Sequence, residues 1–185
     1  TEDSVAAVLN QIHQPIDILV CCAGGNIGSL GVNTQSGGKP SNDTSLTISQ
    51  SDAQSVMDRN FWTTFYVCQA IVPQMVQRQC GQVIIIGSVS ALLGREKGAL
   101  YTVSKAAVHQ YMRCLATEVR SAGVIVNCIA PGATLTERYK RNIGTAEGVT
   151  GQPEHIANAV IQLLQMNFVH GQVIRVDGGE QTFPS

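Results

Sequence analysis

The chain has 185 residues, of which 44% are hydrophobic and 14% charged, and this balance predicts a globular protein with one substantial core. A formal net charge of −1 gives no general attraction to phosphates, so we expect no nucleic-acid and no membrane partner. No signal-like segment opens the sequence, and no apolar run approaches membrane-spanning length. The six cysteines form no Cys-x-x-Cys pair and no array with zinc spacing, which predicts reduced thiols in a cytoplasmic protein without a metal.

Apolar strand patterns alternate with helical patterns along the whole chain. Continuous apolar strands separated by helices are typical of a parallel sheet that is covered on both faces, so the predicted fold class is α/β. In chain order we expect a strand at 16–22, an irregular loop at 24–51, a helical stretch at 51–79 that Pro73 should kink, a strand at 82–86, a helix at 99–120, a strand at 124–129, a short helix at 135–142, a helix at 153–166 and a strand at 172–176.

Three loops should converge on one crevice. Ligands on parallel sheets bind beyond the carboxyl ends of the strands. Ala23-Gly24, Ser88 and Pro131-Gly132 each follow a predicted strand. We therefore look for the functional site at this edge.

Ser88 precedes Tyr101-Thr-Val-Ser-Lys105 by thirteen residues. The i, i+4 spacing places Tyr101 and Lys105 on one face of the predicted helix, one turn apart. A tyrosine with an ordinary pKa of about 10 is a poor base at neutral pH, and a nearby cation lowers that pKa. Ser88 is placed to bind and orient an alcohol or carbonyl oxygen. Each motif alone is weak, because such pairs are common on solvated helix faces and serine ends many strands.

Several motifs follow one another in a specific order: Cys22-Ala-Gly-Gly25, Asp58-Arg-Asn60, Gly87-Ser88, Tyr101 to Lys105, Asn127 to Gly132 with Thr136, and Gly171 to Gly179. With these motifs the sequence resembles the short-chain dehydrogenase/reductase (SDR) family over almost all 185 residues. The resemblance implies a single Rossmann-like, doubly wound parallel sheet over 1–185 and an NAD(P)(H)-dependent oxidoreductase that interconverts a secondary alcohol and a ketone.

The resemblance also implies residue roles. Tyr101 would be the acid/base, Lys105 its pKa-lowering partner and a ribose ligand, Ser88 the oxygen binder, and Asn60 the holder of a proton-relaying water. Asn60 could instead only close a hydrogen bond of its own helix. The choice between NAD and NADP stays open. The residues expected to bind the cofactor are Ala23, Gly24, Tyr101, Lys105, Pro131, Gly132 and Thr136.

Two departures from the family pattern stand out. Cys22 replaces an asparagine whose loss should affect stability more than chemistry. The glycine-rich turn that receives the cofactor pyrophosphate is absent, and the sequence opens where the family's fourth strand is about to form, so we expect a fold without its first three strands and the piece of a longer chain. The alternatives are a truncated, catalytically inactive homologue that acts as an oligomerisation partner, and the epimerase/dehydratase branch, which usually carries a larger C-terminal substrate domain.

The helices at 51–79 and 99–120 carry more apolar residues than one sheet face can cover. We therefore expect a homodimer or homotetramer, as in the family. The small-molecule substrate should bind between 90–100 and 134–150. The histidines share no spacing, and His109 is expected simply to sit on its helix. The apolar residues concerned are Trp62, Phe65, Met75, Tyr111, Met112 and Leu115 for assembly, and Leu92, Leu93, Ala133 and Tyr139 for the substrate wall.

Overall fold

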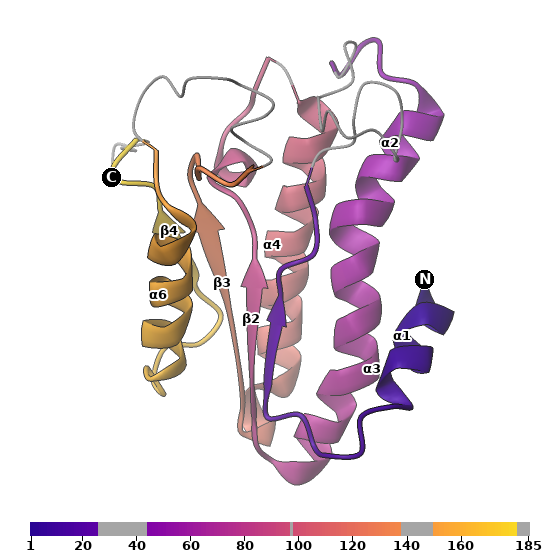
Figure 1. Ribbon diagram of the computed structural model, residues 1–185, viewed down its shortest axis with the longest axis vertical. Helices are drawn as coiled ribbons and strands as arrows, with labels where there is room; N and C mark the ends of the chain where they lie inside the picture. The colour runs from indigo at the N-terminus through magenta and orange to yellow at the C-terminus, as the bar shows by residue number, and fades with distance from the viewer. Residues whose placement is uncertain (26–43, 97, 138–149, 181–185) are drawn as a thin grey trace.

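A parallel sheet of four strands, in the order β1-β2-β3-β4, organises the protein. The computed structural model describes residues 1–25, 44–96, 98–137 and 150–180. All three pairings are parallel, so the carboxyl ends of the strands meet at one edge, the upper one in Figure 1. The predicted α/β fold with a parallel sheet is confirmed. The strands are β1 (Ile18–Cys21), β2 (Gly81–Ile86), β3 (Val124–Pro131) and β4 (Val173–Val176).

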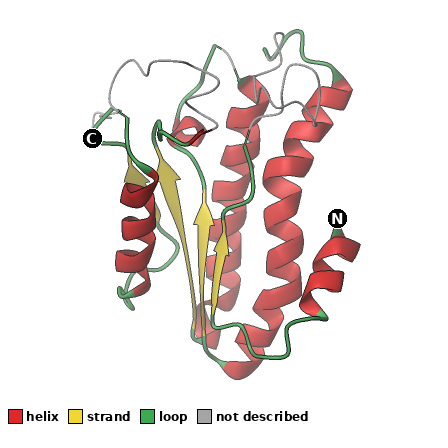
Figure 2. Ribbon diagram, in the orientation of Figure 1, coloured by secondary structure: helices red, strands yellow, loops and turns green. Residues whose placement is uncertain are grey.

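Helices cover both faces of this sheet (Figures 1 and 2). Three helices, α1, α3 and α4, lie on one face, and α6 lies on the other. Among the described residues, the helical elements are α1 (Glu2–Leu9), α2 (Gln50–Met57), a π-helical turn (Asp58–Trp62), α3 (Thr63–Arg78), a 3₁₀ turn (Val89–Leu92), α4 (Ala99–Val119), a second 3₁₀ turn (Arg120–Ala122) and α6 (Pro153–Leu164).

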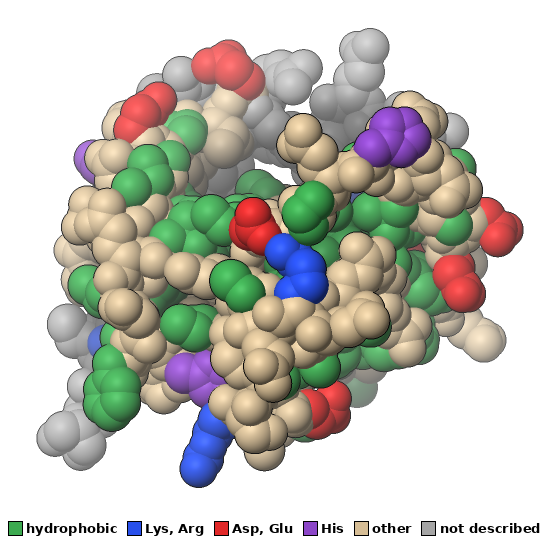
Figure 3. Space-filling view, turned by 90° about the horizontal axis from the view of Figure 1, so that it is seen from below, with side chains coloured by type: hydrophobic (Ala, Val, Ile, Leu, Met, Phe, Trp, Pro, Cys, Tyr) green, Lys and Arg blue, Asp and Glu red, His purple; other side chains and the backbone are tan. Residues whose placement is uncertain are grey.

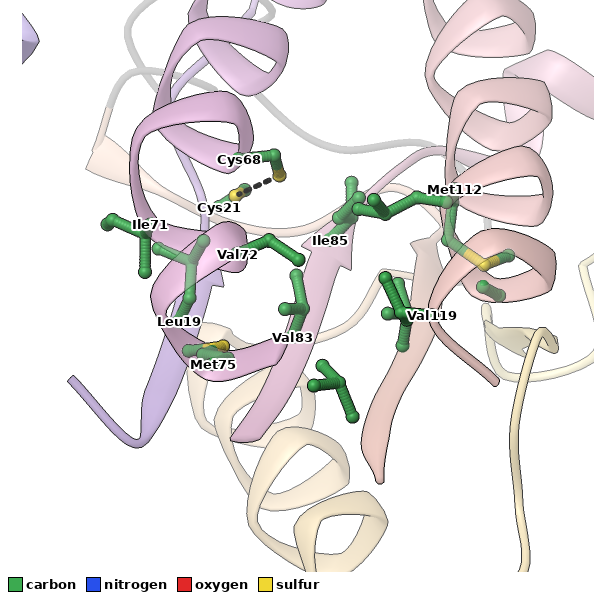
Figure 4. Packing of buried hydrophobic residues seen from close by; sticks show 14 of the residues in the cluster. Leu19, Cys21, Cys68, Ile71, Val72, Met75, Val83, Ile85, Met112 and Val119 are labelled. Atoms are coloured by element: carbon green, nitrogen blue, oxygen red, sulfur yellow. Dashed lines mark hydrogen bonds between the residues drawn. The ribbon is translucent and has the colours of Figure 1, made fainter. Parts of the chain in front are cut away.

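The alternating side chains of β2 build two cores. Val83 and Ile85 are fully buried against α3 and α4, in the cluster shown in Figure 4. Ile84 points to the opposite face, where it packs in a smaller cluster with Leu163 of α6. Burying each such side chain contributes about 1.5–3 kcal/mol. The double burial explains why this strand reads as an unbroken apolar run.

The edge strand β1 is covered on one face. Leu19 and Cys21 are buried under α3, and the Cys21 and Cys68 sulfurs lie 3.8 Å apart as free thiols (Figure 4). Ile18 and Val20 point the other way and are 51% and 41% exposed. The predicted strand therefore has an apolar face that the described residues leave open.

The helical stretch predicted at 51–79 is helical but not uniform. The π-helical turn at Asp58–Trp62 interrupts it, which the sequence pattern did not predict. Pro73, which was expected to kink the helix, lies inside α3, and the helix continues past it to Arg78. Ile71, Val72 and Met75 are buried on both sides of the proline, and this packing offsets its missing backbone hydrogen bond.

Other expectations for the chain had mixed outcomes. The helix α1 was not predicted, although Thr1 and Ser4 form a capping box at its start. The loop at 26–43 and most of the short helix expected at 135–142, including Tyr139, lie outside the described residues.

The amino edge of the sheet is held by a charged contact. Arg78 at the end of α3 donates to Asp17 at 2.6 Å and to the Ile16 carbonyl oxygen at 2.6 Å, just before β1 begins. Figure 3 looks onto this end of the molecule, where acidic and basic side chains are scattered among apolar ones. Lysines and arginines do not gather into a basic patch on this face.

Asn127, in the middle of β3, anchors the approach to β4. Its side chain is fully buried. The amide nitrogen donates to the Val169 carbonyl oxygen at 2.6 Å, and the amide oxygen accepts from the Gln172 backbone N–H at 3.0 Å. The side chain thereby satisfies one backbone carbonyl oxygen and one backbone N–H in the segment that leads into β4.

Asn127→Leu should lower the free energy of unfolding by about 2–4 kcal/mol, because it removes both hydrogen bonds of a fully buried side chain and leaves the two backbone groups without that partner. Urea unfolding followed by circular dichroism measures this. Gln172→Ala is the matched control: it removes an exposed side chain but keeps the backbone N–H, so it should cost under about 0.5 kcal/mol. Equal losses for the two variants would contradict the account.

Candidate active site

Ser88 lies where β2 has just ended. Its backbone is extended and caps the 3₁₀ turn, with Oγ accepting the Ser90 backbone N–H at 3.1 Å. The residue is 7% exposed. No described residue accepts a hydrogen bond from the Ser88 hydroxyl, so this hydroxyl can donate to an incoming oxygen.

Lys105 reaches the same strand end from α4. Its Nζ donates to the Ile86 carbonyl oxygen at 2.9 Å, and the residue is 5% exposed. Burial holds the pKa of this ammonium below its usual value. Tyr101 lies one turn earlier on the same helix face and is half-buried. Ser88 and the Tyr101-Lys105 face are thus brought to one place.

Asn60 joins the end of β1 to this place. It is fully buried in the π-helical turn. Its Oδ1 accepts the Gly25 backbone N–H at 2.8 Å, and its Nδ2 donates to the carbonyl oxygens of Gly25 at 3.0 Å and Val56 at 2.9 Å. The bond to Val56 lies within the helix of Asn60, as the alternative role of this side chain predicted. The bonds to Gly25 show that the side chain also holds the loop after β1.

Gly24 packs between these two side chains without a side chain of its own. A Cβ there would lie 2.9 Å from Asn60 Oδ1 and 3.2 Å from Lys105 Nζ, and its φ of +154° is rarely adopted by other residues. The strand end therefore presents bare backbone next to a buried cation. Ala23 precedes it on the exposed side of the loop.

The loop after β3 lies at the same sheet edge, next to β2. Gly132 donates its backbone N–H to the Val176 carbonyl oxygen at 3.0 Å, and a Cβ on Gly132 would lie 2.9 Å from Asp177 Cα. Thr134 Oγ1 donates to the Gly132 carbonyl oxygen at 3.1 Å. Pro131 ends the strand, and Thr136 follows within the same loop, its backbone N–H bonded to the Thr134 carbonyl oxygen at 2.8 Å. All the predicted site residues thus occupy the carboxyl edge of the sheet.

One residue of this region was missed. His109 is 2% exposed, and its Nε2 accepts the Ser88 backbone N–H at 3.2 Å. It does not simply sit on its helix, as the sequence suggested. Burial, with lesser contributions from Arg113 and Lys105, lowers the pKa of its imidazole to about 4. The available signal was its position four residues after Lys105, on the same helix face.

A pH dependence of stability follows. Between about pH 6.5 and pH 4 the unfolded chain binds a proton at His109 that the folded chain does not. Stability should therefore fall on acidification through this window, by at most about 3 kcal/mol. The difference in unfolding free energy between wild type and His109→Gln should shrink between pH 7 and pH 4, as urea titrations at each pH measure. Parallel curves for the two proteins would contradict the assignment.

Comparison with known proteins identifies the family. Residues 1–146 match the family described as short chain dehydrogenase, and the chain belongs to it. It is 31% identical to the 3-oxoacyl-acyl-carrier-protein reductase FabG of Chlamydia muridarum, over 82% of this chain and 66% of the relative. It is 32% identical to the cyclohexanol dehydrogenase of Rhodococcus sp. TK6, over 94% of this chain and 68% of the relative. The chain thus spans about two thirds of these relatives.

Solved structures give the same fold. A short chain dehydrogenase/reductase family protein with 30% identity superposes with a TM-score of 0.83 over 97% of this chain and 72% of its own. ElxO, solved with NADP bound, has 23% identity and a TM-score of 0.83 over 97% of this chain and 74% of its own. 4-Hydroxyisoleucine dehydrogenase, solved with NADH, has 22% identity and a TM-score of 0.80 over 100% of this chain and 78% of its own. These two proteins share the fold of this chain, and one was solved with NADP and the other with NADH.

Proposed function

We propose that this chain carries the catalytic part of an NAD(P)(H)-dependent oxidoreductase that interconverts a secondary alcohol and a ketone. The observation that supports this most directly is the docking of the Tyr101-Lys105 face of α4 onto the end of β2. The Lys105 bond to the Ile86 carbonyl oxygen fixes that docking two residues before Ser88. A phenol, a cation and a hydroxyl at one strand end suit proton exchange with an alcohol oxygen.

The residues present fit the nicotinamide side of a dinucleotide. Gly24 has no Cβ that would strike Asn60 and Lys105, so the loop after β1 packs directly beside the ammonium that would bind the ribose. Lys105 Nζ donates one N–H to Ile86, and no other acceptor for this ammonium is found among the described residues, so its other two N–H groups can donate to ribose hydroxyls. Ala23, Pro131, Gly132 and Thr136 would complete this side. Both NAD and NADP share this half, so the proposal covers either.

When bound, the nicotinamide would supply or accept the hydride. The protein's part is the proton. Ser88 would donate a hydrogen bond to the substrate oxygen and hold it near Tyr101. Tyr101 would give that oxygen a proton during reduction and take it back during oxidation, with the positive charge of Lys105 favouring the phenolate. Asn60 would hold the loop after β1 in place, and its water relay stays a prediction.

The relatives support a substrate class. One is named for reducing 3-oxoacyl groups on acyl carrier protein, the other for oxidising cyclohexanol. In the 3-oxoacyl group and in cyclohexanol alike, the reacting oxygen is bound to a carbon that has two carbon neighbours. We therefore propose a small alcohol/ketone pair of this kind as substrate.

A second copy of this chain is the proposed protein partner. The aromatic rings on the outer side of α3 and α4 contact one another, with Phe65 and Tyr111 centroids 5.5 Å apart. They line a groove of about 720 Å³ that also reaches Leu115 and Val119. Met75 and Met112, expected at this interface from sequence, are fully buried in the core, and Leu115 is 8% exposed, so the proposal rests on Trp62, Phe65 and Tyr111.

The proposed compartment is the cytoplasm. Cys21 and Cys68 are free thiols 3.8 Å apart, which suits a reducing environment. Among the described helices, none has the length and hydrophobicity to cross a membrane.

Tyr101→Phe should lower kcat by at least about 100-fold with little change in cofactor affinity, because only the exchangeable proton is lost. The measurement is nicotinamide absorbance with a 3-oxoacyl thioester in the reductive direction and cyclohexanol in the oxidative direction. Tyr66→Phe on α3 removes a hydroxyl outside the site and is the matched control, with kcat unchanged within about twofold. Retained turnover in Tyr101→Phe would refute the assignment, and a full-length wild type without turnover or cofactor binding would favour the inactive oligomerisation partner.

Phe65→Glu should dissociate the proposed oligomer, because a carboxylate would be buried in the aromatic contact. Light scattering at micromolar concentration should show wild type as a dimer or tetramer and the variant as a smaller species. Val103→Glu, on the exposed part of α4, is the control and should leave the mass unchanged. A monomeric wild type would count against the interface.

A further inference from the structure

We infer that His109 is a positioning residue that fixes Ser88 for the reaction, and this inference rests on the proposed function. The Ser88 backbone N–H donates to His109 Nε2 at 3.2 Å. Both residues are buried, at 7% and 2% exposure. Ser88 is therefore held at two points: by His109 at the backbone and by Ser90 at Oγ.

His109 works together with Lys105. The two side chains lie one helical turn apart on α4, and they bind the residues on either side of Gly87. Lys105 donates to the carbonyl oxygen of Ile86, and His109 accepts from the N–H of Ser88. Two bonds from successive turns fix both the rotation of α4 and its height along β2. Tyr101, one turn further towards the start of α4, is carried with them.

Gly87 shows how closely the imidazole is seated. A Cβ on Gly87 would lie 2.6 Å from His109 Cδ2 and 2.8 Å from Cys128 Sγ. The ring thus packs directly on the strand backbone, with no side chain between them. A shift of the ring would be transmitted to Ser88 with little slack.

The bond requires a side chain that accepts a hydrogen bond at this reach. An unprotonated imidazole nitrogen does so, and glutamine can place an amide oxygen at a similar distance. Leucine fills similar space without an acceptor, and asparagine is polar but too short. Losing the acceptor leaves the Ser88 N–H unsatisfied, and the 3₁₀ turn that starts there can then shift. A displacement of about 1 Å of a positioned group can cost about 100-fold in rate.

The test compares His109→Gln, His109→Leu and His109→Asn in the intact enzyme, with a 3-oxoacyl thioester as probe. Leu and Asn should lower kcat by about 10–100-fold while the dissociation constant of the cofactor changes less than about twofold, and Gln should restore kcat to within about threefold. Asn keeps a polar side chain in the site, so a folded variant without the bond is available if Leu does not fold.

His170 provides the matched control. It too accepts a strand N–H, that of Val126 at 3.2 Å, and its Nε2 lies 2.7 Å from the Ala116 carbonyl oxygen, away from the site. His170→Leu should lower the melting temperature but leave kcat per folded enzyme within about twofold. A merely structural role for His109 would make the two histidines behave alike.

Amide hydrogen exchange at Ser88 provides a readout that does not need turnover. The Ser88 N–H should exchange at least about tenfold faster in Leu and Asn variants than in wild type and Gln. If the folded Leu and Asn variants keep wild-type kcat and protection, or if Gln is as impaired as Leu, the inference is wrong. A wild type that turns over no probe would overturn the proposed function, while the exchange data would still decide whether His109 holds Ser88.

Discussion

The site depends on how α4 docks onto the carboxyl end of β2. The strand is the centre of the fold, buried on both faces, so its end is a fixed point. Lys105 and His109 attach the helix to backbone groups on both sides of Gly87. The net contribution to stability is about 0.5–1.5 kcal/mol for the neutral bond of His109 and about 1.5–3 kcal/mol for the charged bond of Lys105, and a partner left buried alone costs about 1–3 kcal/mol. Those energies exceed the thermal energy, so the helix face has one register.

The docking carries an electrostatic cost that the core must offset. Lys105 is buried without a carboxylate partner among the described residues, and desolvation lowers its pKa. Burying an unpaired ammonium costs several kcal/mol even after relaxation. On the same helix, Val108 and Met112 are fully buried, and each contributes about 1.5–3 kcal/mol. The burial of apolar side chains on α4 thus offsets the cost of removing Lys105 on the same helix from water.

Features that depend on local sequence could be predicted, and contacts that form only when helix and sheet pack together could not. The strands and long helices came from local apolar patterns, and Ser88, Tyr101 and Lys105 from short spacings at predicted strand and helix ends. The His109 bond joins residues 21 apart and exists only once helix and sheet are packed, so no local pattern predicted it. The prediction that Met75, Met112 and Leu115 lie at an interface was wrong for a related reason. Helical periodicity shows that a helix has apolar faces, but it does not show which face packs on the sheet.

The end of β1 is held by the same device as the end of β2. In each case a buried polar side chain on a helix binds backbone groups just after the strand. Asn60 binds the N–H and the carbonyl oxygen of Gly25, and His109 binds the N–H of Ser88. The π-helical turn contributes to this, because its wider turn carries Asn60 to the loop while Nδ2 still reaches the Val56 carbonyl oxygen. Rigid strand ends suit the proposed hydride transfer, because the nicotinamide and the substrate's carbonyl carbon must be held in position to within a few tenths of an ångström.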